Sequence, residues 1–522
     1  MQPPAADRGM SRPVFALVLA MLAAGVAGRA VQVVAPSNLS DTAMFVYMGK
    51  LVANGGRVGV DLLDNKLPSV GLLMSVPYRL IGADWPGYAA LGLAMTIVAA
   101  LLLARAARRC LGGHAYWPVL VAATVWLNFP PGVFGVLQLE TIQCFFVSLA
   151  ACAVLELLTG RDWRDALTAG LCVGVAAYAK PTAAAVLPAA ALALLLATNW
   201  PARRRIAAVA WLGLGAAIPV AVCAYLLAIT RMTDALPETL RQLRDYSTSS
   251  TADAADLAKP VFVVALLLFP LLVLHRVFRA ERLPAADLSP PGALVAAARR
   301  PICLFVAAWF AFELLGVVAQ RRMYAYHFLV LAPPAALLVG LPLRRLRGRS
   351  MAMAFGPAAA LSVAGACWFV VRADDDARSR AVLGYLSTHT RPGDAVWMDD
   401  YPRLLVETDL RPGSVVPLTF LFANGDTAPL TFSSRILADL RHRSPKYVVL
   451  YDDPARFIRF YQTNMAELVA YPARGENFAT AWTAIDDYVR RHYTTEANVA
   501  GRDILVRRDA LPAHVAGATS AE

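Results

Sequence analysis

The sequence predicts an α-helical polytopic membrane protein that ends in a small α/β domain. Its 522 residues are 58% hydrophobic and only 16% charged, whereas soluble domains carry roughly a quarter charged residues. Long apolar runs recur as far as Val371, and from Ala373 onward the chain becomes polar. We therefore expect a transmembrane domain over residues 1–372, a second domain over 373–510 and a disordered tail over 511–522.

The transmembrane prediction rests on apolar runs that approach the ~20 residues needed to cross a bilayer. We expect about eleven spans, which are Pro13–Val34, Pro86–Ala104, Tyr116–Leu127, Leu137–Leu158, Ala166–Ala179, Thr182–Ala197, Ile206–Ile229, Val261–Leu274, Ile302–Ala319, Phe328–Leu343 and Met351–Val371. No cleavable signal peptide is evident, so the first run is expected to remain as a helix. The spans on either side of Lys180-Pro181 are short, and broken spans are tolerated only where the freed backbone lines a protein cavity.

Orientation follows from the arginines between the spans, which all fall on one predicted side. The clusters lie within Arg105–Arg109, Arg161–Arg164, Arg203–Arg205, Arg276–Arg300 and Arg344–Arg349. Cytoplasmic loops carry the excess of basic residues in membrane proteins. The N-terminus is therefore predicted to be cytoplasmic and the C-terminal domain extracytoplasmic. The net charge of +12 then orients the protein and does not indicate binding to a polyanion.

The first outer loop carries an unusual number of charges between apolar segments. Ala43–Val52 has the pattern of an amphipathic helix lying along a membrane surface. Glycines break this helix and permit a tight turn, at Gly55, Gly56 and Gly59. Leu67–Leu80 then resumes an apolar helix, with Pro68 near its first turn, where proline is tolerated. The two helices frame the charged residues Asp41, Lys50, Asp61, Asp64 and Lys66.

Cations on the predicted outer face are the first candidates for a binding site, because the positive-inside rule disfavours them there. They are Lys66, Lys180, Arg231, Arg241, Arg244, Arg321 and Arg322. A cation near hydrocarbon costs roughly 2.5–3.5 kcal/mol on insertion scales and is a functional-site hypothesis by default. We expect Lys66, Lys180, Arg321 and Arg322 to hold a phosphate carried by a lipid. The alternative is that some of them are anchors that snorkel to the membrane surface.

Acidic and aromatic residues on the same face complete the candidate set. Asp41 is either a general base or an N-cap of the interfacial helix. Asp61, Asp64 and Glu140 are candidates for sugar or acceptor binding, although Glu140 also suits a helix cap. Tyr324 and His327 are either hydrogen-bond donors to the substrate or members of an interfacial aromatic belt.

Motifs for metal binding are weak. The sequence contains no HxH or HExxH pattern. The only DxD spacing joins Asp374 and Asp376 within a run of aspartates where the tail begins, and a solvated linker explains it. We therefore expect no metal ligand and no cofactor; a divalent metal is not indicated.

The C-terminal region shows short apolar runs that alternate with amphipathic ones. Ala395–Met398 and Tyr447–Tyr451 have the composition of buried strands, and Asp503–Arg507 that of a closing strand. Ser433–Arg443 and Ala479–His492 have helical periodicity. An α/β domain outside the membrane is the expected result.

The order of these features along the chain resembles a known superfamily. The resemblance rests on Asp41 after the first span, the run Asp61-Leu-Leu-Asp64-Asn-Lys66-Leu-Pro68, Glu140, Gly170–Gly174 before Lys180-Pro181-Thr182, and Tyr324-Ala-Tyr-His327 followed by Pro333-Pro334. This order resembles the GT-C superfamily of polyprenyl-phosphate-sugar-dependent glycosyltransferases. The nearest branch is that of protein O-mannosyltransferases and bacterial aminoarabinose transferases. The similarity covers roughly Val14 to Val371.

The resemblance implies a GT-C-like fold and assigns roles to two residues. In that family, the acidic residue after the first span is the proposed catalytic base, which corresponds to Asp41. The lysine of a Lys-Pro-Pro run lies near the donor phosphate, which corresponds to Lys66. Two positions depart from the pattern: Leu67 replaces one proline, and Thr42 stands where many members have a second acidic residue.

The function expected from these features is inverting glycosyl transfer at the outer face of a bacterial inner membrane. The donor would be a sugar on a polyprenyl phosphate, and the acceptor a lipid, a glycan or a protein; no nucleic acid partner is expected. One rival is a transporter or flippase for a lipid-linked glycan, which would need a polar route through the bilayer. A second rival is a non-catalytic assembly protein of the cell envelope, in which Asp41 and Lys66 would be dispensable.

Overall fold

The computed structural model describes most of the chain and divides it into two compact units. The described residues are 12–36, 40–129, 136–160, 162–197, 200–248, 261, 264–265, 267, 293–320, 324–340, 348–372, 377–398, 402–416, 428–451, 453–464 and 472–510. Unit 1 comprises residues 1–37, 85–222 and 253–371, and unit 2 comprises 38–84, 223–252 and 372–522. The expected tail over 511–522 lies outside the described residues.

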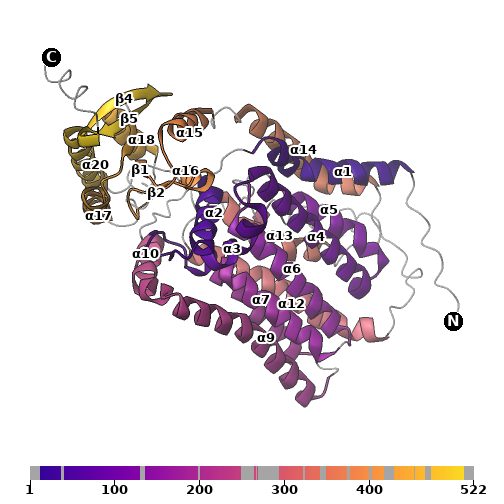
Figure 1. Cartoon of the computed structure of the whole chain (residues 1–522). Helices are drawn as coiled ribbons and strands as arrows, with labels where there is room; N and C mark the ends of the chain where they lie inside the picture. The colour runs from indigo at the N-terminus through magenta and orange to yellow at the C-terminus, as the bar shows by residue number, and fades with distance from the viewer. Residues whose placement is uncertain are drawn as a thin grey trace. The chain divides into compact units, whose positions relative to one another are not determined.

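Unit 1 is helical throughout its described residues (Figure 1). Its elements are α1 (Arg12–Val34), α4 (Trp85–Leu111), η1 (Gly113–Ala115), α5 (Tyr116–Leu127), α6 (Leu139–Leu158), α7 (Trp163–Ala179), η3 (Pro181–Ala185), α8 (Val186–Leu195), most of α9 (Ala202–Ile229), α12 (Ala293–Ala319), η6 (Ala325–Leu331), α13 (Ala332–Gly340) and α14 (Gly348–Arg372). Five helices among the described residues are long and apolar enough to cross a membrane, in α1, α4, α6, α9 and α12. The protein is therefore an integral membrane protein, as predicted. Of the expected spans, Val261–Leu274 lies mostly outside the described residues. The described parts of the others fall mainly on these five helices and on α5, α7, α8, α13 and α14.

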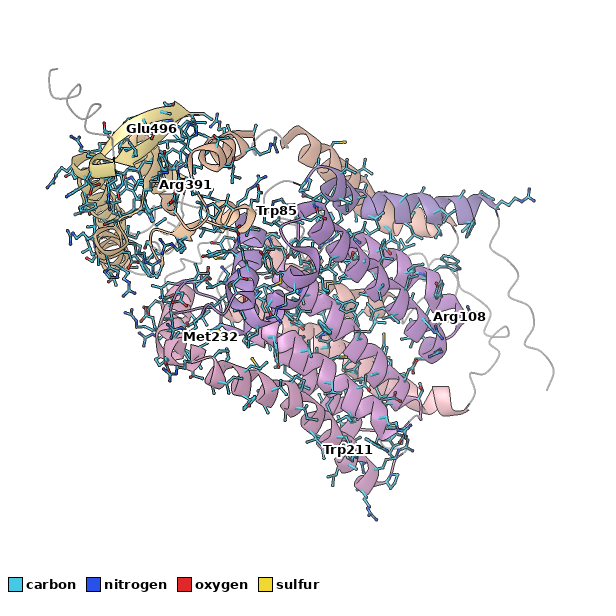
Figure 2. All side chains as sticks on the ribbon, viewed as in Figure 1. Trp85, Arg108, Trp211, Met232, Arg391 and Glu496 are labelled. Carbon is cyan, nitrogen blue, oxygen red and sulfur yellow. The ribbon has the colours of Figure 1, made fainter. Side chains whose placement is uncertain are left out.

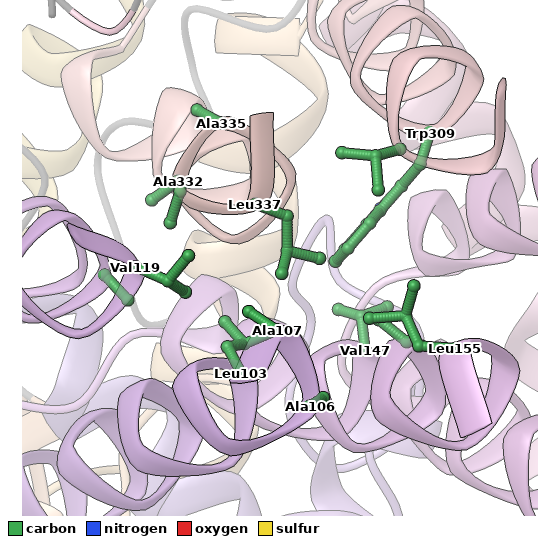
Figure 3. Close-up of a cluster of buried hydrophobic side chains, with 14 of the residues drawn as sticks. Leu103, Ala106, Ala107, Val119, Val147, Leu155, Trp309, Ala332, Ala335 and Leu337 are labelled. Carbon is green, nitrogen blue, oxygen red and sulfur yellow. The ribbon is translucent and has the colours of Figure 1, made fainter. Parts of the chain in front are cut away.

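The core of unit 1 consists of apolar side chains from most of its helices, and Figure 3 shows part of it. Leu103 of α4, Val119 of α5, Val147 of α6, Trp309 of α12 and Leu337 of α13 are all buried there. Because lipid is as apolar as these side chains, close packing holds the helices together more than water exclusion does.

Small residues allow close contact between α7 and α9. A Cβ atom on Gly174 of α7 would lie 2.7 Å from the Ala216 carbonyl oxygen of α9. Only glycine permits the two backbones to approach so closely. The Gly170–Gly174 segment therefore serves packing between α7 and α9.

The predicted break at Lys180-Pro181 is confirmed. Helix α7 ends at Ala179, Lys180 has an extended backbone, and the 3₁₀ turn η3 begins at Pro181 before α8. Proline restricts the residue before it to extended conformations, which ends the preceding helix. At this break the Lys180 ammonium donates to the carboxylate of Glu140 in the first turn of α6.

In unit 2, the segment predicted to be the first outer loop forms two packed helices, α2 (Ser40–Ala53) and α3 (Ser69–Ile81). Gly55 and Gly59 between them have φ of 82° and 88°, which favours glycine and explains the turn. Helix α2 differs from the expected amphipathic helix, because residues 42–50 are all buried. It packs against α3 and against α16 (Pro402–Glu407), which leaves little of its surface exposed.

The C-terminal part of unit 2 is an α/β fold with a five-stranded sheet. Its strands are β1 (Ala395–Met398), β2 (Arg411–Pro412), β3 (Tyr447–Tyr451), β4 (Tyr493–Val499) and β5 (Arg502–Arg507), in the order β2-β1-β3-β5-β4. Strands β2, β1 and β3 run parallel, and β5 pairs antiparallel with β3 and β4. The hairpin between β4 and β5 turns at Ala500 and Gly501, both with positive φ, as in a type I′ turn.

The helices of this fold supply the other half of its core. They are α15 (Ala377–His389), α16, α17 (Ala428–Arg443), α18 (Pro454–Asn464), α20 (Pro472–His492) and the 3₁₀ turn η9 (Arg508–Ala510); η4 (Met232–Ala235) and α10 (Leu236–Thr248) also belong to unit 2. Aromatic rings join sheet and helices: Trp482 of α20 lies 6.2 Å from Trp397 of β1 and 4.2 Å from Phe457 of α18, between ring centroids. The predicted small α/β domain is therefore present.

Candidate functional site

Three residues that the sequence singled out in separate segments come together in unit 1. Glu140 lies in the first turn of α6, Lys180 between α7 and η3, and His327 in η6. The ammonium of Lys180 donates to Glu140 Oε1 at 2.6 Å, and His327 Nε2 lies 3.8 Å from the same oxygen. The Glu140 side chain is only 3% exposed and the Lys180 side chain 18%. We call Glu140, Lys180 and His327 the polar cluster.

Neighbouring residues fix the geometry of the polar cluster. Lys180 also donates to Gln320 Oε1 at 3.2 Å, and Gln320 Nε2 donates to the Gly316 carbonyl at 3.1 Å, which anchors the amide to α12. Tyr326 stands edge-on to His327, with 4.6 Å between ring centroids. Tyr324 stacks on Tyr326 at 5.6 Å and is 41% exposed. The aromatic residues therefore extend from the buried cluster toward an exposed surface.

Glu313 is a buried acidic residue that the sequence interpretation missed. It lies on α12, within a membrane span, and is 1% exposed. Its Oε1 accepts from Trp309 Nε1 at 3.2 Å, and its Oε2 is buried without a hydrogen-bond partner among the described residues. A single acidic residue within an apolar run of this length was an available signal, because such residues are rare in membrane spans and usually functional.

Arg29 of α1 is another buried charged residue in the described spans of unit 1. Its Nη2 donates to Thr141 Oγ1 at 2.7 Å, directly after Glu140 on α6. It is 1% exposed and lies against Gly92 of α4, where a Cβ atom would come within 3.0 Å of Nη1. Arg29 therefore joins three helices at the end of α6 that carries the polar cluster.

In unit 2, Asp64 and Lys66 form a second charged group. Lys66 Nζ lies 3.3 Å from Asp64 Oδ1, which also accepts from the Lys66 backbone N–H at 2.9 Å. The Lys66 ammonium stands 5.7 Å from the centre of the Phe45 ring, a cation–π distance. Asp64 Oδ2 is buried and has no hydrogen-bond partner among the described residues. The pair of Asp64 and Lys66 therefore has one acceptor oxygen, Asp64 Oδ2, to which no described residue donates a hydrogen bond.

Two further carboxylates of the first outer loop, those of Asp41 and Asp61, have different settings. Asp41 lies in the first turn of α2, where the helix dipole favours a negative charge. Asp61 Oδ2 accepts from the Arg57 backbone N–H at 2.8 Å and lies 3.6 Å from Arg57 Nε. Asp61 therefore stabilises its own turn, and its predicted part in sugar or acceptor binding stays a prediction, as does the catalytic role of Asp41.

The loop that carries Asp64 and Lys66 is tied to the C-terminal fold within unit 2. The Leu63 backbone N–H donates to the Val415 carbonyl at 2.7 Å. The neighbouring Val415 N–H donates in turn to Asp439 Oδ2 of α17 at 2.9 Å. This chain of hydrogen bonds connects the charged loop to the α/β fold.

Lys50 of α2 makes the second connection between the first outer loop and the α/β fold. Its ammonium donates to the carbonyls of Leu405 at 2.9 Å, Val406 at 3.3 Å and Thr408. Burial lowers the pKa of Lys50, and the nearby Asp409 carboxylate partly offsets this effect. Lys50 thus caps the carbonyl end of α16 from outside the helix.

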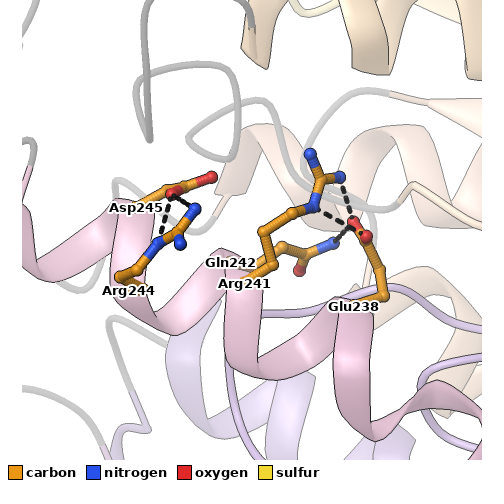
Figure 4. Close-up of polar contacts among 5 residues, drawn as sticks. All are labelled: Glu238, Arg241, Gln242, Arg244 and Asp245. Carbon is orange, nitrogen blue, oxygen red and sulfur yellow. Dashed lines mark hydrogen bonds and ion pairs between the residues drawn. The ribbon is translucent and has the colours of Figure 1, made fainter.

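The arginines of α10, which their predicted side of the membrane made candidates, each pair with an acidic residue of the same helix. Arg241 donates to Glu238 with Nε at 2.9 Å and Nη2 at 2.7 Å, and Arg244 donates to Asp245 at 3.3 Å (Figure 4). Their charges are thus paired on their own helix surface. Glu238 lies three residues before Arg241, and Asp245 directly follows Arg244. This spacing could have indicated the ion pairs from the sequence.

The predicted shared phosphate site of Lys66, Lys180, Arg321 and Arg322 stays a prediction. Lys66 belongs to unit 2 and Lys180 to unit 1. Arg321 and Arg322 lie outside the described residues, as do Asp374 and Asp376. Within the part of the chain that the structure describes, no group of three or more His, Cys, Asp or Glu residues could hold a metal ion.

Comparisons with known proteins agree with this architecture. The family described as dolichyl-phosphate-mannose-protein mannosyltransferase matches residues 65–227, less than half of the chain. The structure of ArnT from Cupriavidus metallidurans bound to undecaprenyl phosphate is 12% identical, with a TM-score of 0.54, and the match covers 94% of this chain and 97% of ArnT. No curated protein matches the sequence.

Two archaeal structures show weaker likeness. The Archaeoglobus fulgidus oligosaccharyltransferase tethered with an acceptor peptide is 12% identical, with a TM-score of 0.47, over 93% of this chain and 72% of that protein. The oligosaccharyltransferase AglB from the same organism, in complex with an inhibitory peptide and a dolichol-phosphate, is 11% identical, with a TM-score of 0.46, over 96% and 75%. At these scores neither carries an argument about function.

The fold is therefore that of a GT-C membrane protein, and the resemblance seen in the sequence is confirmed. More narrowly, the matches lie in the branch of protein O-mannosyltransferases and aminoarabinose transferases. They indicate a glycosyltransferase.

Proposed function

We propose that this protein is an inverting glycosyltransferase that moves a sugar from a polyprenyl-phosphate carrier to an acceptor. The observation that carries the proposal is the convergence of Glu140, Lys180 and His327, from three separate segments, into one polar cluster inside a membrane fold of this class. A buried ion pair adds little net stability by itself. Its presence beside the exposed Tyr324 is better explained by a substrate that needs charged and hydrogen-bonding groups.

The carrier follows from the fold likeness and the chemistry of the cations. ArnT of Cupriavidus metallidurans was solved with undecaprenyl phosphate. We propose a lipid phosphate of this class for the present protein, with Lys66 as the principal cation. Its ion pair with Asp64, at 3.3 Å, is looser than the 2.6 Å pair of Lys180 and Glu140, so its ammonium is more readily shared with a phosphate.

The polar cluster suits a different part of the reaction. Glu140 holds Lys180 closely, and a phosphate placed there would meet the negative charge of Glu140. A sugar or acceptor hydroxyl would instead donate to Glu140 and accept from Lys180 or His327. We therefore propose that Glu140, Lys180 and His327 orient the sugar or the acceptor, together with Tyr324.

The chemical step needs one base and one leaving group. We propose that Asp41 takes the proton from the acceptor nucleophile as that group attacks C1 of the sugar from the face opposite the phosphate. The bond from C1 to the phosphate oxygen breaks, and the phosphate leaves with both electrons. Cations stabilise the negative charge of the departing phosphate, so no acid is needed to protonate it. The proposal therefore includes no metal or cofactor.

The proposed location follows from the basic loops. The arginine-rich loops would face the cytoplasm of a bacterial inner membrane, and the α/β fold of unit 2 would lie outside. A cysteine placed at the exposed position Ser434 of α17 should then react with an impermeant thiol reagent in spheroplasts, whereas one placed at the exposed position Arg203 should not. The reverse labelling pattern would contradict this orientation.

The decisive experiment separates an enzyme from a flippase. Purified protein in detergent micelles is given radiolabelled undecaprenyl-phosphate sugars and a panel of lipid, glycan and peptide acceptors. Micelles have no compartments, so a flippase would leave the donor intact, while a transferase would release undecaprenyl phosphate and label an acceptor. An intact donor across the whole panel, with correctly folded protein, would contradict the proposal.

A further inference from the structure

A hollow far from the polar cluster is lined by arginines and a tyrosine. Its volume is about 640 Å³, and its lining consists of Leu101, Arg105, Arg108 and Arg109 of α4 and Tyr116 of α5. Arg108 is labelled in Figure 2. Arg109 forms an ion pair with Glu156, near the last turn of α6, whereas Glu140 lies in the first turn of the same helix. At ~1.5 Å rise per residue, roughly 24 Å separates the two positions, so the hollow is distinct from the candidate site.

Two of the arginines are available for a ligand. Within the described residues, Arg105 and Arg108 have no carboxylate partner, and both are exposed. The positive-inside rule explains why arginines occur at this end of a span. It does not explain why they surround a hollow together with a tyrosine and a leucine.

An apolar stripe on α4 leads into the hollow. Ile97, Val98 and Leu101 are 36%, 41% and 44% exposed, and helical spacing places them on the same face as Arg105 and Arg108. Such exposure inside a membrane span means contact with lipid chains. The stripe therefore offers an apolar surface that ends at two cations.

Aromatic residues place the hollow at the depth of the lipid headgroups. Tyr116 stands edge-on to Trp117, with 5.1 Å between ring centroids, and Trp117 stands edge-on to Phe15 of α1 at 6.1 Å. Phe15 is 43% exposed. Amphipathic aromatic residues gather where hydrocarbon meets headgroups, so a lipid phosphate would lie level with Tyr116.

We propose that this hollow binds the phosphate of an anionic membrane phospholipid. Arg105 and Arg108 donate to the phosphate oxygens, for which the planar guanidinium is well suited. The Tyr116 hydroxyl supplies a further donor, and an acyl chain lies along Ile97 and Leu101. Basic pockets between membrane helices bind anionic headgroups in this way. A free phosphate would use the arginines but would have no use for the apolar stripe.

The test measures lipid retention by the full-length protein and needs no catalytic assay. Wild type and the Arg105→Gln/Arg108→Gln variant are delipidated in detergent, offered equal amounts of phosphatidylglycerol and phosphatidylethanolamine, and examined by native mass spectrometry. We expect wild type to retain phosphatidylglycerol roughly tenfold more than phosphatidylethanolamine, and the variant to lose most of this preference. The control is Arg203→Gln/Arg204→Gln, which removes two exposed arginines of another cluster and should keep the preference.

Three results would overturn the proposal. Equal retention of both lipids by wild type would show that the hollow does not select an anionic headgroup. An equal loss of preference in the Arg203→Gln/Arg204→Gln control would show that total charge is responsible. Displacement of phosphatidylglycerol by millimolar inorganic phosphate would assign the hollow to free phosphate. Because none of these outcomes depends on glycosyl transfer, they leave the proposed function untouched.

Discussion

Replacement of the buried Lys50 by methionine should destabilise unit 2 more than the loss of an exposed lysine does. The Lys50 ammonium satisfies three carbonyl groups at the end of α16, those of Leu405, Val406 and Thr408. Methionine keeps most of the length and apolar contact of the side chain but donates no hydrogen bond. The carbonyls at 2.9 Å and 3.3 Å would then be left without this donor in a buried setting.

The size of the effect follows from the same contacts. Hydrogen bonds to a charged group contribute about 1.5–3 kcal/mol, and burial of the ammonium, which lowers the pKa of Lys50, offsets part of the gain. Asp409 adds little, because it lies 3.7 Å away and its side chain is 80% exposed. We therefore expect a loss of about 2 kcal/mol, equivalent to a Tm lower by about 4–8 °C for a cooperative unit of this size.

The assay is thermal unfolding of the purified full-length protein, with Lys446→Met as the matched control. Lys446 also bonds a carbonyl, that of His389 at 3.0 Å, and an aspartate, Asp394 at 3.2 Å, but its side chain is 36% exposed. Its loss should lower the free energy of unfolding by less than about 1 kcal/mol. A Tm for Lys50→Met equal to that of Lys446→Met would refute the reasoning from burial.

Three further predictions concern other charged groups. Lys180→Met should destabilise unit 1 by about 3–5 kcal/mol, because it leaves the Glu140 carboxylate buried without its cation. Adding Glu140→Gln should restore most of this stability, as measured by thermal unfolding. Equal Tm values for the single and double variants would contradict this prediction. Glu313→Gln should change the free energy of unfolding little, because the amide oxygen can still accept from Trp309. Glu313→Leu should lower it by about 1–3 kcal/mol. Equal losses in the two variants would show that the hydrogen bond is unimportant. Partial burial raises the pKa of Asp394, but the Arg391 N–H and Lys446 outweigh this effect, so the pKa lies below its usual 3.8. The carboxylate therefore stabilises the fold above pH ~3.8, and this stabilisation is lost as the pH falls through the lower pKa of the folded state. The stability difference between wild type and Asp394→Asn should accordingly shrink in acid, and a difference that is constant with pH would contradict the assignment.

The membrane helices and central strands were predictable because their signal is local. An apolar run long enough to cross a bilayer rarely forms anything except a membrane helix, and β1 and β3 coincide with the predicted Ala395–Met398 and Tyr447–Tyr451. Strand β4 was missed because its residues are mainly polar and partly exposed, as suits the edge of a sheet. Helix α2 was expected to have an exposed face, and only its packing against α3 and α16 shows why it has none.

The candidate site was predictable as a set of residues but not as an arrangement. Charge type and predicted side of the membrane selected Glu140, Lys180 and His327. The contact between Glu140 and Lys180 joins positions 40 residues apart, and no local pattern reports such a pairing. Glu313 lies inside a span and not at a span end, where the other candidates are, although a single acidic residue inside a span is itself a signal.

The most direct test of the proposed chemistry is glycosyl transfer by the Asp41→Asn variant. The substitution keeps the size of the side chain in the first turn of α2 and removes the base. Asp245→Asn is the matched control, because Asp245 pairs with Arg244 on the exposed surface of α10. With the labelled undecaprenyl-phosphate sugar and the acceptor that wild type uses, the account predicts a loss of about 10²-fold or more in the transfer rate of Asp41→Asn, with Asp245→Asn unchanged. Transfer by folded Asp41→Asn at the wild-type rate would contradict the account.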